Sequence, residues 1–202
     1  MLSEFRDQDG DLKTTLTTNG GINMTISSEV IWTAKGYGYE AMAVNALASL
    51  IVRPSTLSQL TLYNNTTNKV FVIERAFLHN LVSIANGQFG IWLCVHPTGM
   101  AIPSGNNISI RNSLSGKAAN TTVGIVDTAE TVADNGWFPW GESGTFVTAT
   151  VPGSLAQALV NGRIQLPPTA GISIQSVAQT AVVTTVPGFH WFAVPTSELK
   201  LG

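Results

Sequence analysis

Short apolar or alternating runs, separated by turn residues at a spacing of roughly ten, constrain the fold of this 202-residue chain most. Residues 69–78 and 88–95 are apolar on both faces of an extended strand, as expected for strands buried on two sides. Asn, Gly and Pro cluster between the runs and mark turns. The other runs that we interpret as strands are residues 58–63, 107–111, 121–126, 145–151, 163–166, 171–177, 181–186 and 189–194. This pattern predicts an all-β sandwich or barrel.

One short segment carries the signals of a helix. Ser154 is a candidate N-cap, Leu155 and Leu159 lie one helical turn apart, and Gly162 follows the expected end. Residues 40–50 are ambiguous, because their alanines favour helix while their flanks resemble strands. We therefore predict a helix at residues 154–160 in an otherwise β-rich chain.

The N-terminal segment differs from the rest of the chain. Residues 1–28 are polar and rich in threonine, and such a segment need not fold by itself. Its few apolar residues suggest short edge strands that add to a sheet, either their own or a partner's. We predict an N-terminal arm at residues 1–28, followed by one β-sandwich domain at residues 29–202.

The chain is poor in charge. Only 11% of its residues are charged, against roughly a quarter in an average soluble domain. Its Lys and Arg residues are scattered singly and the net charge is -2, so we expect no nucleic-acid partner. We see no signal-peptide pattern and no apolar run of membrane-spanning length. Because surface charge normally keeps proteins apart, we expect other subunits to cover much of the surface.

The single cysteine and the three histidines suggest no metal or cofactor site. Cys94 lies in an apolar run and is expected to be a buried small hydrophobe. His96 shares its face of a strand, so a nucleophile with a neighbouring base is the alternative. Apolar surroundings argue against this alternative, because they raise the pKa of a thiol. No His has a Cys or His partner at the usual metal-ligand spacing, and we predict no metal and no cofactor.

A short serine loop offers an enzymatic alternative. Residues 141–144 (GESG) resemble the nucleophile loop of chymotrypsin-like serine proteases. His79 or His96, then Asp127 or Asp134, then Ser143 would follow the chain order of that family. Thr145 stands where the family has another glycine, and a turn into a strand explains the loop equally well. We therefore expect no enzyme.

Aromatic residues supply the candidate interface. Residues 137–140 (WFPW) lie between glycines, and we expect them in a loop. They either cap one end of the barrel, anchor a protein interface or stack against a sugar. Residues 36–39 (GYGY) predict a flexible loop with exposed tyrosines. The candidate interface residues are Trp137, Phe138, Trp140, Tyr37 and Tyr39.

Three segments resemble virion structural proteins of tailed bacteriophages. They are residues 60–75 (LTLYNNTTNKVFVIER), 163–174 (RIQLPPTAGISI) and 189–194 (FHWFAV). The resemblance implies a jelly-roll-like antiparallel β-sandwich that decorates or cements a capsid, without catalysis. A carbohydrate- or receptor-binding module of a fibre or tail is the alternative role.

The resemblance also implies partners and a location. We expect a homo-oligomer, a trimer above all, bound to the major capsid protein or other virion proteins and located on the virion. Neighbouring copies would then cover side chains such as Trp92 and Val70, which a monomer would expose.

Overall fold

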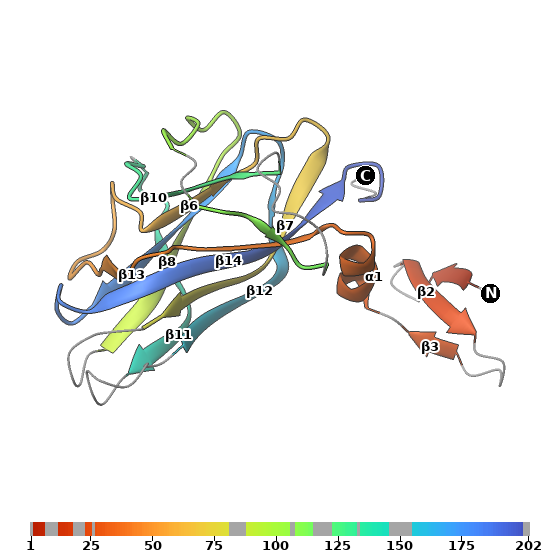
Figure 1. The fold of residues 1–202 in the computed structure, drawn as a ribbon, viewed down its shortest axis with the longest axis horizontal. Coiled ribbons are helices and arrows are strands. Elements are labelled where there is room, and N and C mark those ends of the chain that lie inside the picture. The colour runs from red at the N-terminus through yellow and green to blue at the C-terminus, as the bar shows by residue number, and fades with distance from the viewer. Residues whose placement is uncertain are drawn as a thin grey trace.

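The protein is an all-β sandwich of two packed antiparallel sheets, as predicted. A computed structural model describes residues 2–6, 12–17, 23–25, 27–80, 88–105, 108–114, 123–132, 134–145 and 155–199. The body is drawn as two layers of long strands, with the small N-terminal elements to one side (Figure 1).

The strand order is that of a jelly roll. The smaller sheet has the order β10 (Ile125–Thr128), β6 (Leu60–Tyr63), β13 (Gly171–Ala178), β8 (Gln88–His96), β11 (Phe138–Thr145). The larger has the order β12 (Leu155–Leu166), β7 (Lys69–His79), β14 (Thr184–Pro195), β4 (Gly38–Met42), β9 (Arg111–Asn112), and β5 (Leu47–Ala48) also pairs with β14. In a jelly roll, eight strands lettered B to I in chain order form one sheet B-I-D-G and one sheet C-H-E-F. Here the larger sheet has the order B-I-D-G and the smaller the order C-H-E-F, when the letters B to I are given in turn to β4, β6, β7, β8, β11, β12, β13 and β14. This order confirms the predicted jelly-roll sandwich.

The main core lies between the sheets and follows from strand alternation. Phe71 and Ile73 of β7, Leu93 of β8 and Trp191 of β14 point into it and are at most 1% exposed. On the outward face of β7, Val70 and Val72 are also buried, whereas Phe77 further along the strand is only half-buried. Val70 is 3% exposed within the single chain, so the expectation that a neighbouring copy covers it is wrong.

The predicted helix at residues 154–160 is wrong, because its described part belongs to strand β12. Ala156 and Ala158 point into the core, whereas Leu155 and Leu159 are 46% and 53% exposed. Residues four apart share a face in a helix and in a strand alike, so the leucine spacing fitted both. Gly162 does not end a helix but belongs to the interruption of the β12–β7 ladder between Leu159 and Ile164.

Other strand predictions were correct only in part. Of the described part of the predicted strand at residues 107–111, only Arg111 lies in a strand, the two-residue β9, and residues 108–110 are not strand. Residues 181–186 and 189–194 are not two strands: β14 runs through both, and its Pro187 and Gly188 pair with β7. The ambiguous residues 40–50 contain strand segments, β4 and β5, and no helix. Strand β11 ends at Thr145, where the sequence predicted a strand to begin, and residues 146–151 lie outside the described residues.

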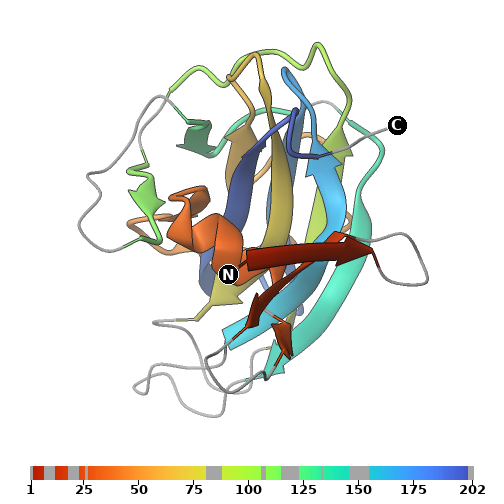
Figure 2. The same cartoon turned by 90° about the vertical axis from the view of Figure 1, so that its right-hand side faces the viewer.

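The N-terminal strands form a sheet of their own. β1 (Leu2–Arg6), β2 (Leu12–Thr17) and β3 (Asn23–Thr25) pair in that order as an antiparallel meander. This sheet lies beyond α1 (Ser28–Ala34), outside the sandwich (Figure 1). Figure 2, seen from that side, places it in front of the sandwich. The predicted arm thus contains three short strands that pair with one another.

Helix α1 attaches to the sandwich through few contacts. The Trp32 ring lies 5.4 Å from the ring of Phe192 on β14. Just after the helix, the Lys35 ammonium and the Tyr37 hydroxyl both donate to the Glu198 carboxylate, at 2.6 and 2.8 Å. Among the described residues, the helix found is far too short to cross a membrane.

Candidate functional site

Residues 130–132 and 134, which we call the crossing segment, cover part of the outer face of the smaller sheet. They run antiparallel to residues 55–58: Ser58 N donates to Glu130 O, Val132 N to Thr56 O and Asp134 N to Ser55 O. Beneath these two segments lies a small hydrophobic cluster, separate from the main core, formed by Cys94, Val132 and Trp137. Trp92 and Met100 pack against it. The outer face of β8 is therefore covered by the chain itself at Cys94 and His96, whereas Trp92 is half-buried.

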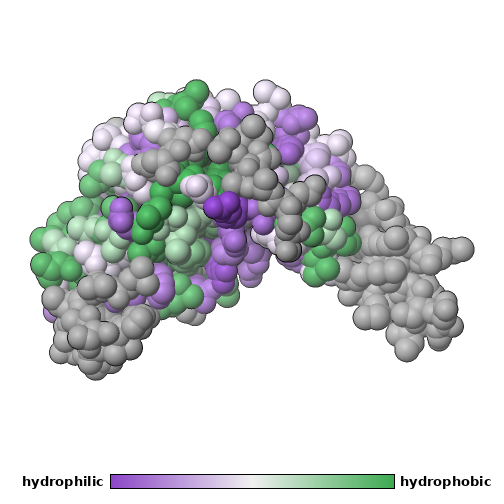
Figure 3. Space-filling view, viewed as in Figure 1, coloured by the Kyte–Doolittle hydropathy of each residue, from purple (hydrophilic) through white to green (hydrophobic). Residues whose placement is uncertain are grey.

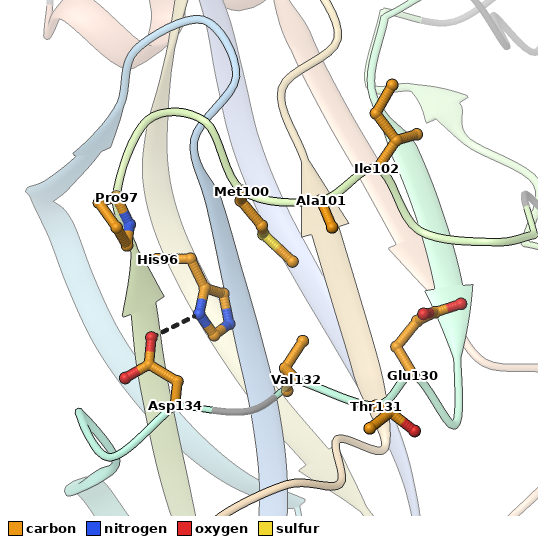
Figure 4. A pocket seen from close by; sticks show the side chains of 9 residues that line it. All are labelled: His96, Pro97, Met100, Ala101, Ile102, Glu130, Thr131, Val132 and Asp134. Atoms are coloured by element: carbon orange, nitrogen blue, oxygen red, sulfur yellow. Dashed lines mark hydrogen bonds and ion pairs between the residues drawn. The ribbon is translucent and has the colours of Figure 1, made fainter.

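An open pocket of about 430 Å³ lies beside this cluster. Figure 4 shows the His96 ring and the Asp134 carboxylate turned toward each other at one side, with Glu130 at the other. Two of the nine lining residues are carboxylates and none is Lys or Arg, so the pocket suits a cation. The lining residues are His96, Pro97, Met100, Ala101, Ile102, Glu130, Thr131, Val132 and Asp134.

His96 connects this pocket to a buried chain of hydroxyls. Its Nδ1 lies 2.9 Å from Asp134 Oδ2, and its Nε2 lies 2.8 Å from Ser173 Oγ on the neighbouring strand β13. Ser173 Oγ is 2.8 Å from Thr61 Oγ1, which is 2.7 Å from Ser58 Oγ. Ser58 Oγ donates in turn to Glu130 O, at 3.3 Å. The hydrogen bonds satisfy polar groups that would otherwise be costly to bury.

The Asp134–His96–Ser173 geometry resembles a hydrolytic triad, but its serine is inaccessible. Ser173 lies within β13 between β6 and β8 and is 0% exposed. Its hydroxyl contacts Thr61 rather than the pocket. A nucleophile must reach the substrate it attacks. These contacts make the serine a structural member of the chain of hydroxyls.

Cys94 is the buried small hydrophobe that the sequence predicted. It is 0% exposed, and burial, reinforced by the charge of Asp134, raises the pKa of its thiol to about 12. Its Sγ lies 3.8 Å from His96 Nδ1, so the two side chains do meet on one face of β8. At neutral pH the thiol stays protonated and is a poor nucleophile.

The structure separates the residues of the protease alternative. His96 and Asp134 come together, but Ser143 pairs with Gly90, six residues before His96 on β8 and thus about 20 Å away along the strand. His79 lies on β7 in the other sheet. Asp127 accepts the backbone N–H groups of Gly105 and Thr128 instead of contacting a histidine.

The aromatic segment is not the loop that we expected. Strand β11 begins at Phe138, and Trp137 is 2% exposed because it packs beside Cys94. Phe138 and Trp140 are half-buried, with ring centroids 5.5 Å apart, and pack against the main core. The Arg163 guanidinium lies 5.4 Å from the Trp140 ring and occupies one of its faces. These contacts match the expectation of a cap better than that of an exposed anchor.

The two candidate tyrosines are not exposed either, contrary to the prediction. Tyr39 belongs to β4, is 5% exposed and stacks on Trp191 with centroids 6.0 Å apart. Tyr37 is half-buried, and its hydroxyl donates to Glu198. The alternation of glycine and tyrosine therefore marks the start of a strand.

An apolar surface that we did not predict lies at one end of the sandwich. Val44, Ile51, Val52 and Val182 are 77%, 62%, 63% and 56% exposed. Ser49 N donates to Val183 O, which holds the loop after β4 beside the β13–β14 turn. Figure 3 shows hydrophobic surface gathered at the corresponding left end of the molecule. We call these four side chains the apolar end.

Comparison with protein-family models and with curated protein sequences gives no match.

Proposed function

We propose that this protein is a non-enzymatic structural protein of a viral particle that decorates or cements the capsid. It acts as a homo-oligomer, a trimer above all, and binds the major capsid protein. The apolar end carries the proposal, because four apolar side chains that are more than half exposed gather at one end of the sandwich (Figure 3). Exposed apolar side chains gathered in one region mark sites of protein association.

The energetics favour contact through this end. Burying the exposed part of each side chain contributes roughly 1 kcal/mol, so several such contacts over a symmetric interface add up. Charge that would oppose association is scarce, at 11% of residues. Many modest contacts on a rigid body suit a protein whose role is to hold subunits together.

The fold supports a virion role only by analogy. Jelly rolls occur in viral capsid proteins, but also in lectins and cupins, so the architecture does not choose among them. The choice of a virion rests on the resemblance of residues 60–75, 163–174 and 189–194 to phage structural proteins.

Oligomeric state and capsid binding test the proposal. Light scattering at about 10 µM should give a multiple of the 21.4 kDa chain mass. The double variant Ile51→Asp with Val182→Lys should dissociate the oligomer and keep its β-type circular dichroism. Val30→Asp serves as control, because Val30 is 58% exposed on α1, at the other end of β4.

Capsids assembled from the major capsid protein of the same virus should co-sediment with the wild type. A monomeric mass together with no co-sedimentation would refute the proposal. An oligomer that survives the double variant would refute the role of the apolar end.

The receptor-binding alternative rests on the half-buried Phe138 and Trp140 side chains on β11. A glycan-array signal that disappears in Trp140→Ala would replace the structural proposal with a carbohydrate-binding one. A blank array would remove this alternative.

A further inference from the structure

Three potential metal ligands from separate parts of the chain converge beside the pocket. Cys94 and His96 project from the same face of β8, and Asp134 reaches them from the crossing segment. Their ligand atoms all lie within 4.8 Å of one another. A thiolate, an imidazole and a carboxylate are the ligands of zinc sites, and three protein ligands leave a fourth position open.

The buried hydroxyls determine which nitrogen of His96 is available. Ser58 donates to a carbonyl oxygen, Glu130 O, which can only accept. When Thr61 and Ser173 donate in the same direction, His96 Nε2 must be the donor to Ser173. In a neutral ring, Nδ1 then carries no hydrogen and faces Asp134 Oδ2. Nδ1 and Oδ2 can then be held together in two ways, by a proton in an imidazolium–carboxylate pair or by a bound metal cation.

The surroundings hold the ligands as the outer partners of a metal site do. Metal-binding histidines usually donate their second ring N–H to a fixed acceptor, which is the role of Ser173 here. Gly136 N donates to Asp134 Oδ1 at 2.7 Å, which leaves Oδ2 directed toward His96. Arg53 donates to the carbonyl oxygens of Asn135 and Trp137 and fixes the turn that follows Asp134.

We propose that Cys94 Sγ, His96 Nδ1 and Asp134 Oδ2 bind one zinc ion, with the fourth position open to the pocket. On binding, the Cys94 thiol loses its proton to solvent and a sulfur–zinc bond forms. No oxidation or reduction is involved. The ion ties the crossing segment to β8, a function separate from subunit assembly.

For the two separations that involve His96, the required movement is small. Tetrahedral zinc places sulfur and nitrogen ligands about 3.6 Å apart and nitrogen and oxygen ligands about 3.4 Å apart. The corresponding separations here are 3.8 Å between Sγ and Nδ1 and 2.9 Å between Nδ1 and Oδ2. The carboxylate therefore moves outward by about 0.5 Å, and it is the most exposed of the three side chains.

Cobalt titration of the full chain, first stripped with a chelator, tests the site. We expect one Co²⁺ per chain, visible bands of tetrahedral cobalt and a near-ultraviolet thiolate-to-cobalt band. Zinc should then displace the cobalt and bleach these bands. Cys94→Ser should abolish the thiolate band, and Asp134→Asn should weaken binding at least tenfold. His79→Gln, a histidine on β7 outside the cluster, should bind as the wild type does.

The variant Ser173→Ala tests whether Ser173 supports the ligand His96 without binding the metal itself. It should weaken cobalt binding by about 10–100-fold while the thiolate band persists at saturation. Circular dichroism of each metal-free variant shows whether it is folded. The proposal is overturned if the folded wild type shows no thiolate band, or if folded Asp134→Asn binds as tightly as the wild type. Asp134 lies in a partly exposed turn, so this variant keeps the test valid even if Cys94→Ser does not fold.

Discussion

The side chain of Asn64 donates a 2.9 Å hydrogen bond from Nδ2 to the backbone oxygen of Leu166, 102 residues further along the chain. The same nitrogen donates to Lys69 O, and Oδ1 accepts from the backbone and hydroxyl of Thr66. Asn64 is 0% exposed, so one amide joins the β6–β7 turn to the end of β12.

Asn64→Asp should therefore be strongly destabilising. It removes both donor hydrogens and places a carboxylate against two carbonyl oxygens, at a cost of about 3 kcal/mol in the free energy of unfolding. Urea denaturation measures this change. Asn68→Asp in the same turn is the matched control, because Asn68 is exposed, and it should change stability by less than about 0.5 kcal/mol. Equal effects of the two variants would contradict the bridging role of Asn64.

Position 188 has no room for a side chain, because Phe77 lies directly opposite it on β7. A Cβ at Gly188 would overlap the ring of Phe77, its register partner. Gly188→Ala should cost about 1–3 kcal/mol of unfolding free energy, because the ring must move. In a Phe77→Ala background the same substitution should cost clearly less. Additive effects in this double-mutant cycle would show that the contact does not limit the position.

The histidine on β14 should make stability depend on pH. Burial, then the charge of Arg75, lower the pKa of His190, and Glu40 opposes them only in part. Arg75 Nη2 lies 2.9 Å from His190 Nε2, and because Arg can only donate, Nε2 must accept and carry no proton. As pH falls below the unfolded pKa of about 6.5, the unfolded state binds this proton more readily, so stability decreases.

His190→Gln isolates this contribution. Between about pH 7.5 and about pH 5, the wild type should lose more unfolding free energy than the variant. Denaturant titrations at both pH values provide the comparison. Parallel losses in the two proteins would show that His190 is not the titrating group.

Cys94 should be chemically inert in the folded, metal-free protein. Its thiol is 0% exposed and has its pKa raised to about 12 by burial and by Asp134, so little thiolate is available to attack a disulfide reagent. We expect negligible labelling of the native chain near pH 8 and complete labelling in denaturant. Rapid labelling of the native chain would place Cys94 at an accessible surface.

The fold could be predicted where the apolar pattern was long and unambiguous. Residues 69–78 and 88–95 became β7 and β8 because their two apolar faces fit only a strand buried on both sides. The pattern failed at residues 154–160, where the inward residues are the small Ala156 and Ala158 and the outward ones are leucines. In this edge strand, the spacing of the exposed leucines fitted a helix as well, which is why the sequence predicted one.

The cluster of Cys94, His96 and Asp134 could be predicted only in part, and the sequence analysis predicted no metal there. The period of a strand put Cys94 and His96 on one face, and the structure confirms that they meet. Asp134 and Ser173 lie 38 and 77 residues away from His96, and tertiary contacts bring them there. Likewise, no local signal showed that Ser55 and Thr56 would hold the backbone of the crossing segment.

The jelly-roll order has a consequence for when this protein can fold. The two C-terminal strands of the sandwich, β13 and β14, are inserted between strands made much earlier: β13 between β6 and β8, and β14 between β7 and β4. During synthesis, the edges of β6, β8, β7 and β4 that β13 and β14 will cover therefore stay open until those two strands have left the ribosome. A chain stalled before β13 would expose four unpaired strand edges, two on each sheet.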